Sequence, residues 1–591
     1  MKKKLYPRLV SVFFIAGFIF SAYVNAENEL SRSATMKGSN PKKADYVIIG
    51  NGTAGAIIAR FLSDPVNNHF VNSVVVLEAG QNLSADPSVL QGAPFGDSIV
   101  EKDPKYAKTS FANIANLNPG LVGFPYTEGR MWGGSSAHNG EFCVRDTPYR
   151  CDAIAAIAGN AIWSYNNLLP LMKFLENYTP NGTVANPAQR GVNGPLNIIQ
   201  DPPLANLIMN ALSSATNSPL VTDINDPSQG QVGVGVHQWW ASTAGVRSFS
   251  SGAFLPASIV DQNTGKGLGG RKLTIVSGAT VTRILFKNTS DRPKAYAVEY
   301  ILDGIEQEVL IAKGKKKIIL CAGVIQSPAI LQRSGVGSAT LLNSLNIPVV
   351  ADNANVGANL QNHYSTAALI GLDVAHPFPF QIINVYSDLS GANLPPADHI
   401  RRNQMYVVIG NAFFPAAPLV ALGLQNTPAI TLLPTNIIPN SRGSVQIVSA
   451  NPLTEPRVSF NFYSDTVAPT DLDLAVNSYK MVANIAAAYG QPVLYPPMSH
   501  YPAPYGPAPD DSLLRQDAIN VNTVAYHAAG TCKMSSSAVD GVVDGTLHVY
   551  GVDNLMVADD STVPLVPDAN TAYRAYLTGC VASKILGVVL P

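Results

Sequence analysis

The stretch DYVIIGNGTAG, Asp45 to Gly55, sets a short apolar run directly before three glycines spaced as G-x-G-x-x-G. The apolar residues predict a buried strand over 43–49, and AIIARFLSD, residues 56–64, predicts the helix that follows the glycine loop. A second apolar run, Ser73 to Leu77, predicts another strand that ends at Glu78. Strand, loop, helix and second strand together predict a βαβ unit, and with it an α/β fold.

This unit has the features of a dinucleotide site. Glycines allow a tight turn and let the backbone approach a pyrophosphate, which rests on the helix N-terminus. Glu78 follows roughly 20 residues later, where a carboxylate accepts from a ribose 2′-hydroxyl and would repel the 2′-phosphate of an NADP-type ligand. These residues alone leave FAD and NAD both open. We expect the dinucleotide to contact Gly50, Gly52, Thr53, Ala54, Gly55, Glu78 and Ala79.

Length and charge narrow the class of protein. The chain has 591 residues, 46% of them hydrophobic and 13% charged, which is too long for one ordinary domain and favours two intertwined ones. The formal net charge is -1. Such a balance implies no basic face, so nucleic acid and acidic lipid are poor candidate partners.

The N-terminus resembles an export signal. Three lysines and Arg8 precede an apolar run from Leu9 to about Val24, and Val24-Asn25-Ala26 fits a small-x-small cleavage site. We therefore expect a signal peptide over 1–26, a polar linker over 27–43, and a periplasmic or extracellular protein. The run is shorter than a spanning helix needs, so no stable membrane span is expected after cleavage; the alternative is an uncleaved anchor.

The cysteines and histidines do not form a metal site. The five cysteines are an odd number, so at least one stays free or pairs between chains. An exported protein could form a Cys143–Cys151 or a Cys532–Cys580 disulfide, and the sequence does not choose. Neither a CxxC motif nor a Cys/His cluster has metal-ligand spacing, so we expect no metal.

The rest of the chain alternates helical and strand patterns. Residues 151–178 read as helical, 273–286 and 295–309 as strands, and 316–323 as a strand followed by a helix over 329–335. Residues 365–440 lack sharp periodicity, and strand character resumes over 441–447. No internal repeat is present.

Several motifs, in order along the chain, resemble those of the GMC (glucose–methanol–choline) flavoprotein oxidoreductases. They are GNGTAG with LEAG, GRMWGGSSAHNG, CAGVIQSPAILQRSGVG, VGANLQNH, SRGSVQI, YHAAGTCKM and VDGTLHVYGVDNLMVADDSTVP followed by ANTAY. The motifs extend from residue 45 to 587, essentially the whole mature chain.

The resemblance implies FAD rather than NAD, and a discontinuous architecture. It implies a Rossmann-like FAD-binding domain built from residues 44–160, 246–364 and 521–591. It also implies an α+β substrate domain with a large antiparallel sheet, built from 161–245 and 365–520.

The resemblance assigns catalysis to two side chains. His527, in the HxxGTC part of YHAAGTCKM, matches the family's catalytic base, and its unperturbed pKa of about 6.5 suits proton acceptance from an alcohol near neutral pH. Asn570 matches a position that is His or Asn in the family. An amide cannot take the proton, so Asn570 would orient the substrate oxygen. It could also cap the last helix, expected from Thr571 to about Leu586.

The remaining cofactor contacts are also assigned by resemblance. His138 stands where choline oxidases join a histidine to the C8 methyl group of FAD, so the cofactor is either tethered there or only adjacent. With Asn570, this makes the site residues closest to the choline oxidase/dehydrogenase-like branch. Asp559 matches the family's Asp near FAD, whereas Asp560 departs from the small residue usual there. The expected contacts are Arg130, Gly133, Gly134, Ser135, His138, Asn139, Gly140, Val281, Ala322, Asp559, Asp560 and Thr571.

The resemblance therefore predicts an FAD-dependent enzyme that oxidises a small alcohol to a carbonyl by proton abstraction and hydride transfer to flavin N5. Oxygen or a quinone would accept the electrons. Two alternatives stay open: a lyase of the hydroxynitrile type, which keeps FAD without turnover, and a non-catalytic protein on the same fold. Bleaching of the flavin by alcohols would separate the oxidoreductase from both.

Overall fold

The computed structural model describes residues 40–66, 72–91, 103–113, 122–202, 207–312, 314, 316–372, 381–388, 400–409, 427–521 and 523–591. The expected signal peptide and most of the expected linker lie outside the described residues. None of the helices in the described part combines the length and the apolar character that a bilayer span requires.

A parallel sheet forms the predicted βαβ unit and extends it. Its five strands, in spatial order, are β10 (Leu273–Ser277), β3 (Val74–Glu78), β2 (Tyr46–Ile49), β14 (Lys317–Leu320) and β26 (Leu555–Val557). Val47, Ile48, Val76, Ile318 and Ile319 are fully buried. Strands buried on both faces need continuous apolar runs, which explains why the sequence showed them clearly.

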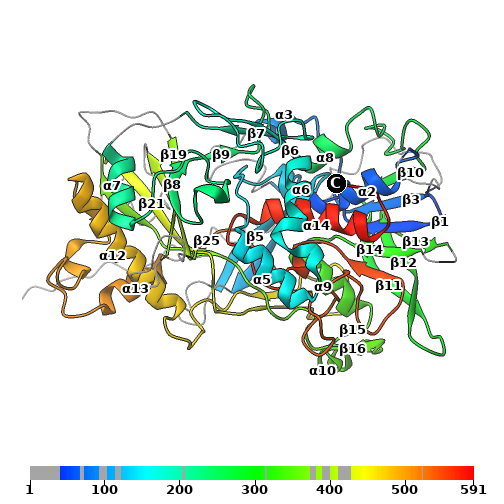
Figure 1. The fold of residues 1–591 in the computed structure, drawn as a ribbon. Coiled ribbons are helices and arrows are strands. Elements are labelled where there is room, and N and C mark those ends of the chain that lie inside the picture. Colours follow the sequence, from blue (N-terminus) through cyan, green and yellow to red (C-terminus); the bar gives the residue numbers. More distant parts are fainter. Residues whose placement is uncertain are drawn as a thin grey trace, which may run out of the picture. The chain divides into compact units, whose positions relative to one another are not determined.

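Helices cover this sheet. They include α2 (Thr53–Leu62) after β2, α9 (Gly323–Arg333) after β14, and α14 (Thr571–Ile585), which packs against α2 (Figure 1). The expected last helix is thus confirmed. A four-stranded sheet lies in the same part of the chain: β1 (Lys43–Ala44), β13 (Ile305–Ile311), β12 (Lys294–Leu302) and β11 (Thr280–Lys287).

A second large sheet is antiparallel. Its main path is β24 (Val493–Tyr495), β18 (Ala368–Gly371), β21 (Ala429–Asn436), β20 (Asn403–Ile409), β19 (Gln381–Ser387) and β8 (Gly233–Val236). Off this path, β17 (Tyr364–Ser365) pairs with β21, and β25 (Thr523–Val524) pairs with β17. The long helix α12 (Asp471–Tyr489) packs on it and contacts α7 (Leu207–Thr216) and α13 (Ser512–Asn520) (Figure 1). The fold therefore has the expected two parts, an α/β part and an α+β part with a large antiparallel sheet. β25, which we placed in the third FAD segment, pairs with this second sheet.

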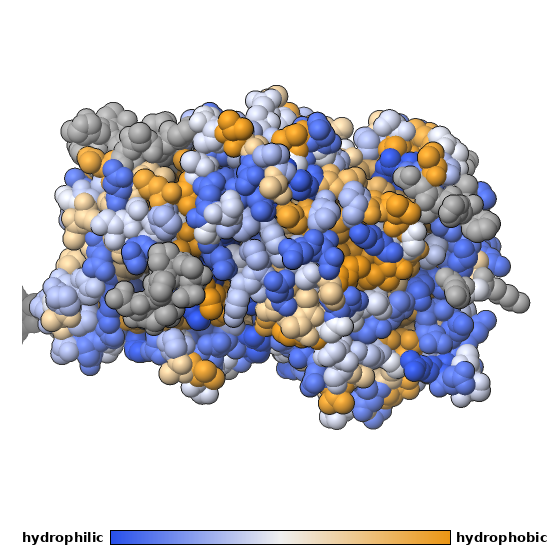
Figure 2. All heavy atoms as spheres, in the orientation of Figure 1, coloured by the Kyte–Doolittle hydropathy of each residue, from blue (hydrophilic) through white to orange (hydrophobic). Residues whose placement is uncertain are grey.

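Smaller elements complete the fold. The described part of the chain has three further sheets. One contains β22 (Ser444–Gln446), β23 (Arg457–Ser459), β4 (Ala107–Asn113) and β5 (Val122–Gly129). The second contains β6 (Glu176–Thr179), β7 (Leu196–Gln200) and β9 (Gln238–Trp239), and the third pairs β15 (Val336–Gly337) with β16 (Ala351–Asp352). The other α-helices are α3 (Pro87–Leu90), α5 (Pro148–Ala158), α6 (Tyr165–Leu175), α8 (Ser250–Phe254) and α10 (Ala339–Ser344). On the face drawn in Figure 2, small apolar groups lie between polar ones.

Two local expectations were wrong. The helical stretch 151–178 is two helices, α5 and α6, separated by a break after Gly159 (φ +61) and followed by strand β6. The helix expected from residue 329 begins at Gly323 and runs through Pro328. Proline deprives the carbonyl of Val324 of its helical partner, and the hydroxyl of Thr531 donates to that carbonyl at 2.6 Å instead.

The cysteines form neither of the two candidate disulfides. All five are buried free thiols, and Cys143, Cys151, Cys532 and Cys580 pack in the main hydrophobic core. They act there as small apolar side chains, a common role for free cysteine.

Candidate active site

One large cavity lies between the two sheets. Its volume is about 1000 Å³, and its walls include residues at the carboxyl ends of β2 and β3 as well as Tyr406 of β20 and Leu433 of β21. The carboxyl edge of a parallel sheet is where ligands bind in open α/β folds. The cavity therefore joins the predicted dinucleotide site to the antiparallel sheet.

Glycines bring two backbones together at the cavity wall. A Cβ on Gly134, whose φ is +52, would stand 2.8 Å from the Cα of Gly52, so only glycine permits this approach. A Cβ on Gly55 would stand 2.1 Å from the carbonyl oxygen of Gly50, which lets α2 pack tightly on the β2 loop. The two glycines thus serve close packing rather than flexibility.

Three helices begin at the cavity, and none of the three N-cap residues caps its helix with its own side chain: α2 after Gly52, α9 after Ala322 and α14 after Asn570. At the start of α9 the N–H of Gly323 donates instead to the carboxylate of Asp559. Their first N–H groups lack helical partners, and the positive ends of their dipoles lie at the wall. Such a wall favours phosphate oxygens and any negative charge that develops nearby.

Glu78 closes the dinucleotide end. Its two carboxylate oxygens accept from the backbone N–H groups of Asn51 and Gly80, each at 2.7 Å. Each oxygen keeps a second lone pair for a ribose hydroxyl. Burial is the main influence on this carboxyl and raises its pKa.

Most residues predicted from the sequence line this cavity. They are Gly50, Gly52, Thr53, Ala54, Glu78, Ala79, Arg130, Gly134, Ser135, His138, Asn139, Gly140, Val281, Ala322, His527, Asp559, Asp560, Asn570 and Thr571. Gly55 and Gly133 do not line it: Gly55 packs beneath the β2 loop, and a Cβ on Gly133 would stand 2.8 Å from the ring of Phe249. These two support the wall from behind.

His527 lies in the loop after β25 and meets two partners. Its Nε2 is 3.0 Å from Nδ2 of Asn570, and its Nδ1 is 2.9 Å from Nδ1 of His363. The other nitrogen of His363 is 2.9 Å from the carbonyl oxygen of Pro567. A carbonyl only accepts, so His363 Nε2 carries a proton.

These contacts define the protonation of His527. Burial lowers the pKa of His527 to about 4 and holds the pKa of His363 well below its usual range, so both rings are neutral near pH 7. Neutral His363 then offers a lone pair at Nδ1, to which Nδ1–H of His527 donates. The lone pair of His527 is therefore at Nε2, facing Asn570. The pKa of His527 is thus lower than the unperturbed value of about 6.5 that was expected from the sequence.

Asn570 occupies the N-cap position of α14, but its side chain caps nothing there. Its oxygen accepts from the hydroxyl of Tyr406 at 2.9 Å and from Nε2 of Gln404 at 3.4 Å, and its nitrogen faces His527. The structure thus favours a role for the Asn570 side chain beside His527 in the cavity over a role as the cap of α14.

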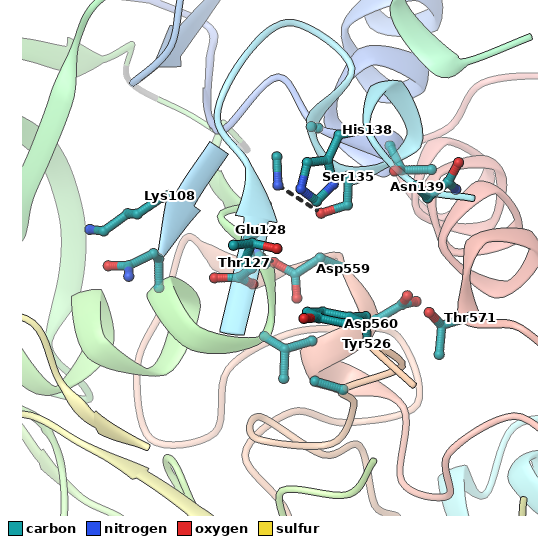
Figure 3. A pocket seen from close by; sticks show the side chains of 18 of the residues that line it. Lys108, Thr127, Glu128, Ser135, His138, Asn139, Tyr526, Asp559, Asp560 and Thr571 are labelled. Atoms are coloured by element: carbon teal, nitrogen blue, oxygen red, sulfur yellow. Dashed lines mark hydrogen bonds between the residues drawn. The ribbon is translucent and has the colours of Figure 1, made fainter. Parts of the chain in front are cut away.

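His138 projects into the same cavity, near Ser135 (Figure 3). It is buried, and neither ring nitrogen has a hydrogen-bond partner within the part of the chain that the structure describes. Burial, with a smaller contribution from Arg247, lowers its pKa to about 4. A neutral imidazole with both nitrogens unpaired fits contact with a further group in the cavity.

Acidic side chains gather along one wall. Glu128 and Asp559 point into the cavity (Figure 3). Asp559 accepts from the N–H of Gly323 at 2.9 Å and from the hydroxyl of Ser327 at 2.6 Å, which ties it to the start of α9. Burial raises the pKa of Glu128 to about 7 and that of Asp560 well above its usual range. Among the described residues, no cluster of these groups has the geometry to hold a metal ion.

Comparison with known proteins identifies the family. Models of the GMC oxidoreductases match residues 44–365 and 439–579. The GMC oxidoreductase family protein Mala s 12 of Malassezia sympodialis is 27% identical over 96% of each chain. An oxygen-dependent choline dehydrogenase of Acinetobacter baumannii is 27% identical, over 93% of this chain and 97% of its own.

The chain belongs to the GMC oxidoreductase family.

Solved structures of similar fold agree with this assignment. Pyridoxine 4-oxidase from Mesorbium loti superposes with a TM-score of 0.72 at 22% identity, covering 91% of this chain and 98% of its own. A formate oxidase variant of Aspergillus oryzae superposes with a TM-score of 0.74 at 21% identity, covering 93% and 99%. At these identities the likeness shows the fold.

The family assignment confirms the resemblance and FAD as the cofactor, and the cavity fits this group. The glycine wall and the uncapped start of α2 suit the pyrophosphate, and Glu78 suits the ribose. His138, with both nitrogens unpaired, suits contact with the flavin end.

Four residues that line the cavity or contact His527 and Asn570 were not identified from the sequence. They are Glu128, His363, Gln404 and Tyr406. His363 stood in the quoted motif VGANLQNH without an assigned role. Gln404 and Tyr406 are two residues apart on a strand and so share a face. That spacing was the available signal, but nothing in it indicates which face meets the cavity.

Proposed function

We propose that the protein oxidises the CH–OH group of an alcohol to a carbonyl, with FAD as the hydride acceptor. The observation that carries the proposal is the pair formed by His527 Nε2 and Asn570 Nδ2, 3.0 Å apart in the wall of the cavity that holds the dinucleotide cradle. A neutral base and an amide donor that lie side by side can together bind and deprotonate a hydroxyl group.

His527 is the proton acceptor in this mechanism. Its pKa near 4 keeps the imidazole unprotonated at neutral pH, and the hydrogen bond to His363 keeps the lone pair at Nε2. Asn570 cannot take the proton, so it donates Nδ2–H to the alcohol oxygen as negative charge develops there. When bound, FAD supplies the site that receives the hydride from the carbinol carbon.

The surroundings stabilise negative charge. The N-terminus of α14 begins directly after Asn570, and its first residues, Thr571 and Ala572, line the cavity. A helix N-terminus there lowers the free energy of an alkoxide, and it would do the same for negative charge on FAD when that group is bound. His527, by accepting the proton, and the start of α14, by stabilising the negative charge, therefore both favour formation of the alkoxide.

The substrate side of the cavity favours an apolar or aromatic alcohol. Phe142, Tyr406, Leu433 and Val524 line it, and the rings of Phe142 and Tyr406 stack with centroids 4.8 Å apart. Binding against such walls is favourable for a substrate that buries apolar or aromatic surface there. We propose a primary alcohol with an aromatic or branched apolar remainder, and oxygen or a quinone as the electron acceptor.

Two further features belong to this proposal. We propose that His138 carries the FAD through a bond from a ring nitrogen to the C8 methyl carbon, supported by its two unpaired nitrogens. We also propose that residues 1–26 direct export to the periplasm or beyond, supported by the basic and apolar pattern of the first 24 residues. Cell fractionation, with N-terminal sequencing of the mature protein, tests the export.

An anaerobic titration tests the function. The purified protein is mixed with a panel of primary alcohols, aromatic, aliphatic and cationic, while the visible flavin absorbance is followed. Bleaching by an alcohol, abolished in His527→Ala, supports the oxidation. Cleavage of a cyanohydrin without bleaching would instead support the lyase, and absence of flavin would contradict both.

A further inference from the structure

Asn570 works only in one orientation of its amide. With Nδ2 toward His527, it donates to the lone pair at Nε2 and, in turn, to a substrate oxygen. With the amide rotated by half a turn, the oxygen would face that lone pair at about the same distance. Two acceptors at this distance repel, unless the proton of His527 moves to Nε2, and that move removes the base.

The proton positions in this series of hydrogen bonds follow from its first member, the carbonyl oxygen of Pro567. The carbonyl of Pro567 fixes the proton on His363 Nε2, so His363 Nδ1 accepts from His527, and His527 Nε2 accepts from Asn570. The oxygen of Asn570 therefore faces Tyr406 and Gln404, which must both donate. The bond from Tyr406, at 2.9 Å, is the shorter of the two and holds the oxygen in place. A tyrosine hydroxyl can donate or accept, whereas an amide nitrogen can only donate, so the longer bond from Gln404, at 3.4 Å, adds a preference for the oxygen on this side.

The two donors are held rigidly. They stand two residues apart on β20, which lies between β19 and β21 in the antiparallel sheet. Gln404 is fully buried and its Nε2 also donates to the hydroxyl of Tyr386 at 2.7 Å. The ring of Tyr406 is stacked on Phe142 with an angle of 16° between the planes, which prevents it from turning away.

We propose that Tyr406, assisted by Gln404, is a positioning residue that holds the Asn570 amide in the orientation that leaves His527 Nε2 as the proton acceptor. The inference deepens the proposed alcohol oxidation and rests on it for its kinetic consequence. Its structural consequence, the tautomer of His527, does not depend on which substrate the enzyme uses.

The first experiment reads the tautomer directly. Protein labelled with ¹⁵N at the ring nitrogens of its nine histidines is compared with the Tyr406→Phe variant by NMR, and the His527 signals are assigned by their loss in His527→Gln. In the parent, Nδ1 of His527 carries the proton. In Tyr406→Phe, a share of the protein shows the proton at Nε2. Unchanged His527 signals in the variant overturn the proposal.

The second experiment measures the coupling to Asn570. The rate of anaerobic flavin reduction by an alcohol is measured in a double-mutant cycle of Tyr406→Phe and Asn570→Ala. Loss of one oriented hydrogen bond is expected to slow the parent about 10-fold. In the Asn570→Ala background the same change is expected to alter the rate less than about 2-fold, because the amide it orients is absent.

Equal effects of Tyr406→Phe in both backgrounds, or no effect in either, overturn the proposal. Tyr463→Phe is the matched control, since Tyr463 is a buried tyrosine that donates to the carbonyl of Ala518 away from the cavity. It is expected to leave both the rate and the His527 signals at parent values. If no alcohol reduces the parent flavin, the proposed function fails, while the NMR comparison still decides the positioning role.

Discussion

Replacing His363 by leucine removes the acceptor that keeps the proton of His527 on Nδ1. His363 is fully buried and joins His527 to the carbonyl of Pro567 through two bonds of 2.9 Å. Leucine leaves two buried polar groups unpaired, which costs about 2–4 kcal/mol of stability. His527 can relieve part of this cost only by moving its proton to Nε2, where it no longer acts as a base.

The expected kinetic loss is therefore that of a misplaced general base, about 10²-fold or more in the rate of flavin reduction. His363→Asn is the matched variant, because the asparagine oxygen stands near the place of Nδ1 and can accept from His527. We expect it to retain the parent rate within about 10-fold. Stopped-flow reduction under anaerobic conditions, with thermal unfolding as a check of the fold, measures both variants. Equal losses in the two variants, or a parent rate in His363→Leu, would refute the reasoning.

Three other outcomes are expected. Acid precipitation should leave the yellow colour in the protein pellet and His138→Ala should release it to the supernatant; colour wholly in the supernatant of the parent rules out the tether. The rate of flavin reduction should stay near its plateau as pH falls to 5.5, since a base with a pKa near 4 is still about 97% unprotonated there, whereas one at 6.5 would be about 10% unprotonated. The rate then falls as pH approaches 4, and a midpoint near 6.5 contradicts the burial argument. Thr531→Val should lower the free energy of unfolding by about 1–2 kcal/mol, because the carbonyl of Val324 loses its donor beside Pro328; an unchanged denaturant midpoint counts against that role.

The nucleotide-binding half of the fold could be predicted because its signals are local. β2 and β3 are buried on both faces and carry continuous apolar runs, and the loop between β2 and α2 needs glycine at positions that only glycine can occupy. The antiparallel sheet was harder to read. β20 and most of β21 are also fully buried, so their sequences lack the alternation that identifies a half-buried strand.

The proposed catalytic pair, His527 and Asn570, was assigned from the family resemblance, whereas the side chains that contact this pair could not be predicted. His363 lies 164 residues before His527, and Tyr406 lies 164 residues before Asn570. Only the fold brings β20, β17 and the loop after β25 to one wall. The lowered pKa of His527 has the same origin, because burial is a property of the assembled cavity and cannot be read from the residues flanking the histidine.

The start of α9 shows how a distant residue can override a local rule. The sequence predicted a helix only from residue 329, directly after Pro328, whereas α9 begins at Gly323. The hydroxyl of Thr531, from the loop that carries His527, donates to the carbonyl of Val324 and so replaces the bond that the proline removes. The same contact ties the loop that carries His527 to the helix that begins at the cofactor cavity.

The most direct test of the central claim is the anaerobic titration of the purified protein with a primary aromatic alcohol. The account predicts a flavin spectrum that the alcohol bleaches completely, with the corresponding aldehyde formed in equal amount, and no bleaching in His527→Ala on the same timescale. A flavin that no alcohol in the panel reduces, or one that is reduced equally fast without His527, would contradict it.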